Sequence, residues 1–354
     1  MKGLILAGGV GSRLRPFTYS GPKQLFPIAN RPVLLYAVDA LVAAEIRDIA
    51  VLVSPESHAE IARAVGDGTA WGANIRYIVQ DRPAGLAHAV ATARTFVGDD
   101  AVCVYLGDNL LGAPIRPAVE AFAAGASDAS VLLKAVDDPS RFGVAVVDGA
   151  GRVTGLVEKP PVPPSKLALI GVYLLRPRIF EAIGRIAPSA RGELEITDAL
   201  MELIALGGRV DFSVTDAWWI DTGKMDDLLR ANDAALETWL VPACHGELDE
   251  STIVGPVRVE AGAHVVRSRV VGPAVIGAGA RVVDATVGPG VSVGAGVVIE
   301  RATVQRSILL ERCEIRDVAI ERSLVGRRVV VRPAATASLW VGDDCEVALP
   351  GKAP

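Results

Sequence analysis

The sequence predicts an α/β domain with a mostly parallel sheet over residues 1–240 and a parallel β-helix over residues 241–354. Up to about Leu240, strand-like apolar runs alternate with amphipathic helical stretches, which is the pattern of βαβ units. After Leu240 the helical periodicity stops and short glycine-bearing units recur. The length of 354 residues also favours two domains over one.

Strands in the first domain are predicted where apolar residues run together, and helices where apolar residues recur at three- or four-residue spacing. The predicted strands are Gly3–Ala7, Asp48–Val53, Ile75–Val79, Ala101–Leu106, Ala129–Ala135, Gly143–Val147, Leu169–Leu175 and Arg209–Val214. The predicted helices are Val33–Glu45, Ser57–Val65, Leu86–Phe96, Ile115–Ala124, Arg178–Ile183, Thr197–Leu206 and Met225–Trp239. Ligands of such sheets bind beyond the carboxyl ends of the strands, so residues that follow the strands are candidates for a site.

The β-helix is predicted from a repeat of five or six residues, in which an aliphatic residue leads each unit and glycine often follows. Typical units read IGAG at 276–279 and VGAG at 293–296. The leading aliphatic residues stand at positions 254, 259, 265, 271, 276, 282, 287, 293 and 299. Three such units form one coil, and the leading residues are expected to be buried inside it. The repeat continues less regularly to Val325, and we expect Trp340 to help cap the end.

Composition excludes several classes of protein. With 51% hydrophobic and 22% charged residues, the chain is neither disordered nor fibrous and can bury a large core. A net charge of −5 argues against a broad nucleic-acid-binding surface. No apolar run reaches the roughly 18 residues that span a bilayer, and the N-terminus leads directly into the first strand without a signal peptide. We therefore expect a cytoplasmic protein with no membrane partner.

The segment from Leu6 to Lys23 joins the first strand to a loop rich in glycine and cations, and we call it the opening loop. Its main glycines and cations are Gly8, Gly9, Gly11, Arg13, Arg15 and Lys23. Glycines let successive backbone N–H groups converge on an anion, and guanidinium and ammonium groups add charged donors. The spacing fits neither a Walker A motif nor a dinucleotide-binding fingerprint. The opening loop is therefore predicted to bind phosphates, although such a loop can also be a plain strand-to-helix turn.

Two aspartates follow strand-like segments at distant points of the chain. Asp108 comes after Ala101–Leu106, and Asp221 ends the segment Trp218–Asp221. Two carboxylates at strand ends can share one Mg²⁺, which accepts carboxylate and phosphate oxygens. For either residue alone, a role in a turn or a helix cap explains the sequence equally well.

The opening loop, together with the segment PKQLFP at 22–27, resembles the sugar-1-phosphate nucleotidylyltransferases, and most closely the long-form glucose-1-phosphate thymidylyltransferases. The resemblance extends over essentially the whole chain. It implies a Rossmann-like nucleotidyltransferase domain followed by a left-handed β-helix of hexapeptide repeats. It also implies that glucose 1-phosphate attacks the α-phosphorus of dTTP in line, giving dTDP-glucose and pyrophosphate, with Mg²⁺ as the cofactor.

The same resemblance implies roles for individual residues. The residues implied to bind the nucleotide are Leu6, Gly8, Gly9, Gly11, Arg13, Lys23, Gln24, Gln80, Pro83, Gly85 and Asp108. Those implied to bind the sugar phosphate are Asn109, Gly143, Glu158, Lys159, Tyr173 and Arg191. Those implied to act in catalysis are Arg13, Lys23, Asp108 and Lys159. Asp108 and Asp221 are implied to hold the metal.

Alternatives remain open at several of these positions. Without the resemblance, Tyr173 is a core residue and Arg191 is a solvated loop residue. Phe142 stands where many relatives carry tyrosine, which bears on the choice of sugar. The Gln80 amide matches the O4 and N3–H edge of thymine and of uracil alike, so UTP is an alternative to dTTP, as is ATP.

Other functions are also compatible with the sequence. The β-helix favours assembly of identical subunits, so we expect a homo-oligomer that binds dTTP and glucose 1-phosphate. A C-terminal acetyltransferase would need a histidine base between coils, and His264 is the histidine found within the repeats. A non-catalytic regulatory paralogue would be free to lose the cations and aspartates of the first domain, which this chain retains.

Overall fold

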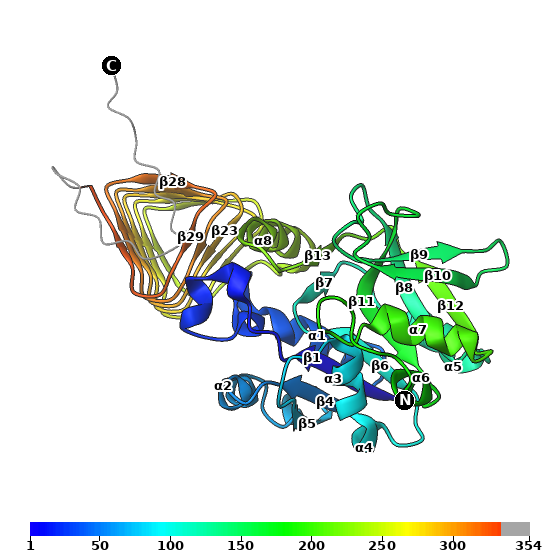
Figure 1. Ribbon diagram of the computed structural model, residues 1–354. Helices are drawn as coiled ribbons and strands as arrows, with labels where there is room; N and C mark the ends of the chain where they lie inside the picture. The colour runs from blue at the N-terminus through cyan, green and yellow to red at the C-terminus, as the bar shows by residue number, and fades with distance from the viewer. Residues whose placement is uncertain (334–354) are drawn as a thin grey trace.

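The computed structural model describes residues 1–333, so the predicted cap at Trp340 lies outside the described residues. Figure 1 shows an α/β domain beside a triangular prism of stacked coils, with helix α8 (Met225–Trp239) between the two. The first short strand of the prism, β14, begins at Ala243. Within residues 1–333, no helix is long and apolar enough to cross a membrane.

The α/β domain is built on a nine-stranded sheet in the order β10-β9-β11-β6-β1-β4-β5, with β8 attached to β11 and β12 attached to β8. The strands are β1 (Lys2–Ala7), β4 (Asp48–Val53), β5 (Asn74–Val79), β6 (Val102–Leu106), β8 (Ala129–Ala135), β9 (Gly143–Val147), β10 (Val153–Glu158), β11 (Leu167–Leu175) and β12 (Val210–Val214). Strands β6, β1, β4 and β5 run parallel, as the alternating pattern predicts. Strand β11 runs antiparallel to β6, β8 and β9, and β9 and β10 form an antiparallel pair. The sheet is therefore parallel in its first half and mixed in its second.

Helices cover both faces of the sheet (Figure 1). They are α1 (Val33–Ala43), α2 (His58–Val65), α3 (Leu86–Thr92), α4 (Arg94–Val97), α5 (Arg116–Ala124), α6 (Ile179–Ile183) and α7 (Ile196–Ala205). Alternate residues of β1 enter two hydrophobic clusters, so Leu4 packs with α3, α6 and α7 while Ile5 packs with α1, α2 and α5. The prediction of one helix over Leu86–Phe96 is wrong, because the backbone leaves the helical conformation at Ala93.

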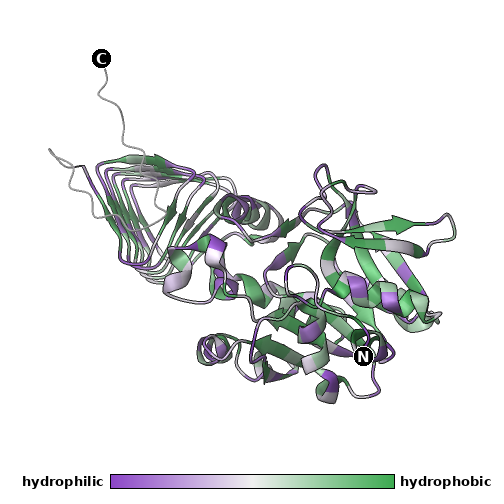
Figure 2. Ribbon diagram, in the orientation of Figure 1, coloured by the Kyte–Doolittle hydropathy of each residue, from purple (hydrophilic) through white to green (hydrophobic). Residues whose placement is uncertain are grey.

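The second domain is a three-sided parallel β-helix, and Figure 2 shows hydrophobic and hydrophilic residues alternating around its coils. One face contains β14 (Ala243–Cys244), β17 (Val257–Val259), β20 (Ala274–Ile276), β23 (Val291–Val293), β26 (Ile308–Leu309) and β29 (Leu324–Val325). The next contains β15 (Glu247–Asp249), β18 (His264–Val266), β21 (Arg281–Val283), β24 (Val298–Glu300), β27 (Glu314–Arg316) and β30 (Val330–Val331). The third contains β16 (Thr252–Val254), β19 (Arg269–Val271), β22 (Thr286–Val287), β25 (Thr303–Gln305) and β28 (Ala319–Glu321).

The predicted inward positions of the β-helix are correct except at 254 and 271. Val254 is exposed and Val271 is half-buried, whereas Ile253 and Val270 pack into the hydrophobic interior. In both strands the middle residue faces inward, because side chains alternate across a strand. The spacing of aliphatic residues alone does not show which of two adjacent ones is buried.

A fourth hydrophobic cluster joins the opening loop, α8 and the β-helix. Its members include Leu14, Phe26, Leu228, Leu229, Ile308 and Leu310. Beside it, the buried amide oxygen of Asn232 accepts hydrogen bonds from the Ala29 N–H at 3.0 Å and from Ser292 Oγ at 2.6 Å. The opening loop is thus packed directly against the second domain.

Candidate functional site

The opening loop leaves β1 at Gly8 and packs against the side chain of Lys23. A Cβ atom on Gly11 would lie 2.9 Å from Cβ of Lys23, and one on Gly9 would lie 3.1 Å from its Cε. Gly11 also has a φ of 70°, a conformation that glycine adopts without strain. These two glycines therefore let the lysine side chain lie directly against the loop backbone.

The ammonium group of Lys23 forms an ion pair with Oδ2 of Asp108. Burial acts to lower the pKa of Lys23, but the Asp108 carboxylate outweighs it and raises that pKa above its ordinary value. Burial likewise acts to raise the pKa of Asp108, and the Lys23 charge holds it below its ordinary value. Both groups are therefore charged at neutral pH.

A small two-stranded sheet brings Asp221 next to Asp108. Strand β7 (Asn109–Leu111) pairs antiparallel with β13 (Trp219–Asp221), and Asp221 lies opposite Asn109. Thr222 ties the end of β13 to the start of β7, because its N–H at 3.0 Å and its hydroxyl at 2.8 Å both donate to the Asp108 carbonyl oxygen. Burial, and after it the neighbouring Asp108 carboxylate, raises the pKa of Asp221 to about 6.

Arg13 approaches the two aspartates from the opening loop. A Cβ atom on Gly223 would lie 3.3 Å both from Nη2 of Arg13 and from Oδ1 of Asp221, so the two side chains lie on the same side of Gly223. The charges of Lys23 and Arg13 act to lower the pKa of Asp221 against the larger effects of burial and Asp108. Two carboxylates and two cations therefore gather at one point.

The two aspartates fit one divalent cation. Within residues 1–333, no group of three or more His, Cys, Asp or Glu side chains could hold a metal. Mg²⁺ is commonly bound by one or two carboxylates, with substrate phosphates and waters completing its coordination. The raised pKa of Asp221, due to burial and to Asp108, reflects a repulsion that a bound cation relieves.

A cavity of about 230 Å³ opens beside Lys23 and Asp108. The residues predicted to bind the nucleotide that line it are Leu6, Gly8, Gly9, Lys23, Gln24, Gln80, Pro83, Gly85 and Asp108. Two others, Gly11 and Arg13, lie in the opening loop and do not line this cavity. The structure thus brings together residues that are separated by up to about a hundred positions in the sequence.

Two buried glutamines line this cavity. Gln24 is 1% exposed, and its Nε2 donates to the Gly9 carbonyl oxygen at 3.1 Å. Its Oε1 is buried and has no hydrogen-bond partner within the described part of the chain. Since an unsatisfied buried acceptor costs about 1–3 kcal/mol, this oxygen is a candidate acceptor for a donor on a ligand. Gln80 is 7% exposed, and its Nε2 lies 2.8 Å from Nδ1 of His88.

The backbone at Gly85 fixes the start of α3 beside the cavity. A side chain on Gly85 would overlap the backbone of Leu194, and its φ of 100° is also unfavourable for other residues. The Ala87 N–H donates to the Leu194 carbonyl oxygen at 3.0 Å, and the Leu194 N–H donates to that of Ala84 at 2.8 Å. Glycine is required here because two chain segments meet closely.

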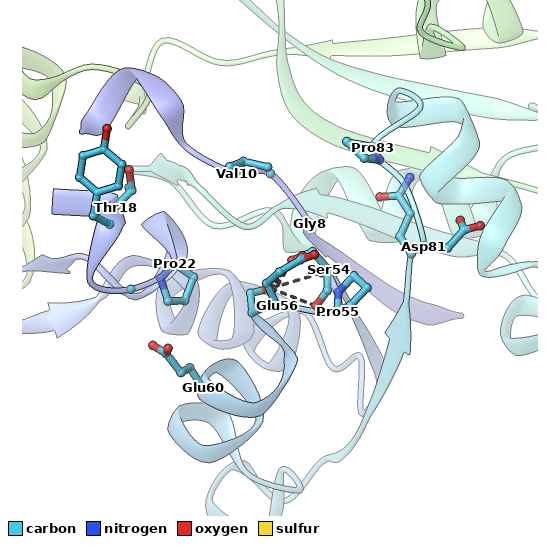
Figure 3. A pocket seen from close by; sticks show the side chains of 15 residues that line it. Gly8, Val10, Thr18, Pro22, Ser54, Pro55, Glu56, Glu60, Asp81 and Pro83 are labelled. Carbon is cyan, nitrogen blue, oxygen red and sulfur yellow. Dashed lines mark hydrogen bonds between the residues drawn. The ribbon is translucent and has the colours of Figure 1, made fainter. Parts of the chain in front are cut away.

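A second cavity, of about 460 Å³, adjoins the first, and Gly8, Gly9, Gln80 and Pro83 line both. In Figure 3, Pro22 and Glu60 lie on one side of it and Asp81 and Pro83 on the other. Its lining includes three carboxylates, those of Glu56, Glu60 and Asp81. Phosphates are therefore better accommodated on the side of Lys23 and Arg13 than here.

Glu158 and Lys159 end β10 at a cluster of charged residues. Lys159 Nζ lies 3.5 Å and Arg191 Nη2 lies 3.7 Å from Glu158 Oε1, while the Thr197 hydroxyl donates to Oε2 at 3.3 Å. Burial raises the pKa of Glu158 although Lys159 acts to lower it. A Cβ atom on Gly143 would lie 3.2 Å from Oε2 of Glu158, so this glycine provides space for the carboxylate.

Arg191 lies in an exposed loop, as its sequence environment alone suggests, and its guanidinium group is held there by carboxylates. Its Nη2 lies 2.9 Å from Oε1 of Glu195, which is buried, and 3.0 Å from Oε2 of Glu193. Tyr173 is 4% exposed and belongs to the hydrophobic core, as its sequence environment alone suggests. Burial raises the pKa of Tyr173, and the Glu158 carboxylate adds to this effect, so the tyrosine lies near the charged cluster.

Asn109 connects the aspartates to an aromatic pair. Its Nδ2 donates to Oδ1 of Asp108 at 2.9 Å, and its Oδ1 accepts a hydrogen bond from Nε1 of Trp219 at 2.7 Å. The Trp219 ring packs edge-on against Phe142, with 4.8 Å between ring centroids. Phe142, a residue next to the predicted sugar pocket, is therefore linked to Asp108 through Trp219 and Asn109.

Comparison with known proteins identifies the family. Residues 2–238 match the nucleotidyl transferase family. The chain belongs to this family. It is 48% identical to a glucose-1-phosphate thymidylyltransferase of Streptomyces griseus over 94% of both chains. It is also 48% identical to one of Streptomyces antibioticus, over 94% of this chain and 93% of that relative.

Solved structures give the same relationship for the first domain. This nucleotidyl transferase matches a putative glucose-1-phosphate thymidylyltransferase from Bacillus anthracis with a TM-score of 0.63 and 40% identity, over 66% of this chain and 95% of that one. It matches a UDP-glucose pyrophosphorylase solved with UDP-glucose with a TM-score of 0.60 and 26% identity, over 67% of this chain and 98% of that one. The Rossmann-like fold predicted for the first domain is confirmed.

The site of this nucleotidyl transferase also contains residues that the sequence did not single out. Leu52, Leu86, Ala89, Leu106 and Glu193 line the smaller cavity, and Thr222, Trp219 and His88 position polar groups at its edge. Trp219 and Thr222 lie within two residues of Asp221 in the sequence, and this proximity could have marked them as site residues. Nothing in the sequence marked His88, whose partner Gln80 lies on a separate segment.

Proposed function

We propose that this nucleotidyl transferase transfers a thymidylyl group from dTTP to glucose 1-phosphate, giving dTDP-glucose and pyrophosphate. The observation that carries the proposal is the cluster of Lys23, Arg13, Asp108 and Asp221 at one end of a cavity that also presents the Gln80 amide. Such a site offers charge to phosphates and a donor–acceptor edge to a base. The near full-length relatives named above carry this activity in their names.

The reaction needs positioning and charge neutralisation more than proton transfer. A sugar phosphate monoester is already anionic near neutral pH, so its oxygen can attack the α-phosphorus in line without a general base. Two anionic groups must approach each other, and Lys23 and Arg13 are proposed to offset the charge of the nucleotide phosphates. Lys159 and Arg191 are proposed to hold the attacking sugar phosphate, with Glu158 bonding to sugar hydroxyls.

The two aspartates are proposed to hold Mg²⁺. When bound, Mg²⁺ supplies positive charge that offsets that of the phosphates. Thr222 and Asn109 hold the Asp108 backbone and carboxylate in place, and Lys23 keeps that carboxylate ionised. These contacts keep an oxygen-rich site ready for a hard cation.

UTP is the second candidate nucleotide. The Gln80 amide offers the same hydrogen bonds to uracil as to thymine, and the fold match to a UDP-glucose pyrophosphorylase supports this alternative. ATP is less well supported, because its base presents a different edge.

The β-helix is proposed to assemble identical subunits rather than to acetylate. His264 lies on the surface of the first coils, with Nδ1 3.0 Å from Oε2 of Glu247, and both side chains are well exposed. A catalytic base is expected in a cleft rather than on an open face. Light scattering of the purified protein measures the subunit number, and an acetyl-CoA assay tests the alternative.

The test is a pyrophosphate-release screen of dTTP, UTP and ATP against a panel of sugar 1-phosphates with Mg²⁺. We expect the highest kcat/KM for dTTP with glucose 1-phosphate. Asp108→Asn should lower kcat at least about a hundredfold, since it removes a charged metal ligand, whereas Asp81→Asn in the adjoining cavity should change it less than about twofold. Release from another substrate pair alone would overturn the substrate assignment, and a fully active Asp108→Asn would overturn the metal site.

A further inference from the structure

We infer that Asn232, on helix α8, is a positioning residue for the nucleotide site, because it holds a strained turn of the segment that bears Lys23 and Gln24. This inference rests on the proposed function of the cavity beside Lys23 as a nucleotide site. Asn232 does not line that cavity, so it acts through the backbone that joins the turn to Lys23.

The strained turn consists of Ala29 and Asn30, which connect β2 (Pro27–Ile28) to β3 (Arg31–Pro32) in an antiparallel hairpin. Both residues have a positive φ, 49° at Ala29 and 61° at Asn30. Asparagine adopts such a conformation more readily than most residues, but alanine does not, because its Cβ atom approaches a carbonyl oxygen. A residue such as Ala29 keeps a positive φ where the surrounding contacts hold it there.

The contacts that hold the turn come from α8 and from the β-helix. The Ala29 N–H donates to Oδ1 of Asn232 at 3.0 Å, and Nδ2 of Asn30 donates to the Val293 carbonyl oxygen at 2.6 Å. Within residues 1–333, these are the hydrogen bonds that the turn makes outside its own hairpin. A backbone N–H can only donate, so the amide oxygen of Asn232 must face Ala29, and the orientation of this amide is fixed.

The turn and Lys23 belong to one short segment, and hydrogen bonds link its two ends. The Val33 N–H, at the base of the hairpin, donates to the Phe26 carbonyl oxygen at 3.1 Å, and the Phe26 N–H donates to that of Lys23 at 3.1 Å. Phe26 is buried in the cluster that joins the opening loop, α8 and the β-helix. A change of the turn would therefore displace the hairpin and, through Phe26, the backbone of Lys23 and Gln24.

Loss of the Asn232 amide should release the turn. Asn232 is 1% exposed, so water does not readily replace the lost acceptor, and the Ala29 N–H is left unsatisfied. Ala29 then relaxes toward a negative φ, whereas a glycine at this position has no such preference. Ala29→Gly should therefore keep the geometry of the turn when Asn232 is lost. A role of Asn232 confined to holding the two domains together would not be corrected by this second change.

The test measures the association constant for dTTP by calorimetry, with Mg²⁺ and without sugar phosphate, in full-length variants. We expect Asn232→Ala to lower this constant about tenfold, and Asn232→Ala with Ala29→Gly to restore it to within about threefold of wild type. The matched control combines Asn232→Ala with Glu45→Gly, since Glu45 is exposed beyond the other end of α1 and has a φ of 63°. This control relieves a similar strain, so it should stabilise the fold without restoring dTTP binding.

Asn232→Leu carries the same test if Asn232→Ala does not fold, since leucine fills the buried volume without an acceptor. Unchanged dTTP binding in a folded Asn232 variant, or recovery by Ala29→Gly no greater than by Glu45→Gly, would overturn the inference. Binding of dTTP by wild type with no pyrophosphate release would instead count against the proposed reaction alone. Failure of wild type to bind dTTP would overturn both.

Discussion

Replacing Gly11 by alanine should impair catalysis far more than it impairs folding. The φ of 70° at Gly11 costs an alanine about 1–2 kcal/mol. The new Cβ would also lie 2.9 Å from Cβ and 3.1 Å from Cδ of Lys23. Because Cβ of Lys23 is fixed to its own backbone, it cannot swing aside, and either the loop or the lysine must shift.

That shift would move the Lys23 ammonium relative to Asp108 and the phosphates. Misplacement of a charged group by a fraction of an ångström to 1 Å can lower the rate up to about a hundredfold. We therefore expect kcat/KM for dTTP to fall by about ten- to a hundredfold in Gly11→Ala, measured by pyrophosphate release. The matched control is Gly72→Ala, since Gly72 has a similar left-handed conformation (φ 61°, ψ 33°, against 70° and 35° at Gly11) but its Cβ atom would meet no atom within 4 Å.

The two variants should lose similar stability from backbone strain, about 1–2 kcal/mol, in urea unfolding. Only Gly11→Ala should lose activity at a temperature where both are folded. If Gly11→Ala keeps wild-type kcat/KM, then the close contact between loop and lysine does not position Lys23, and the reasoning fails.

Two further predictions concern the packing and charges around the site. Leu310 is buried between the opening loop and the β-helix, so Leu310→Ala should lower the free energy of unfolding by about 2–5 kcal/mol. The control Leu248→Ala, at an exposed position, should change it by less than about 0.5 kcal/mol. Equal losses would mean that the two domains are not coupled through this cluster. Burial raises the pKa of Glu158, so ionisation of this carboxyl opposes folding as the pH rises above its unfolded-state pKa. The Glu158→Gln variant should therefore melt at a higher temperature than wild type near pH 8 and at the same temperature below about pH 4. A lower melting temperature of the variant at pH 8 would refute this.

The sequence predicted local features well because local chemistry determines them. The apolar run of β1 and the glycines after it specify a buried strand and a tight loop, and the structure has both. The β-helix was predictable because its period recurs in every coil. The break at Ala93 was not, since no glycine or proline stands beside Ala93 to interrupt a helix.

The meeting of distant residues was only partly predictable. Asp108 and Asp221 come together through the pairing of β7 with β13, and no local signal says which short strands pair. The resemblance placed both aspartates at a metal, but it gave no account of Thr222 or Trp219, which hold them. Gln80 directly follows β5 and His88 lies on α3, and only the fold shows that their side chains meet.

The most direct test of the central claim is to follow dTTP and glucose 1-phosphate by ³¹P NMR after adding enzyme and Mg²⁺. Transfer to the sugar phosphate predicts loss of both substrates in step with the appearance of pyrophosphate and of one diphosphate-linked nucleotide sugar in equal amounts. Consumption of dTTP with glucose 1-phosphate left intact, or no consumption of either, would contradict the account.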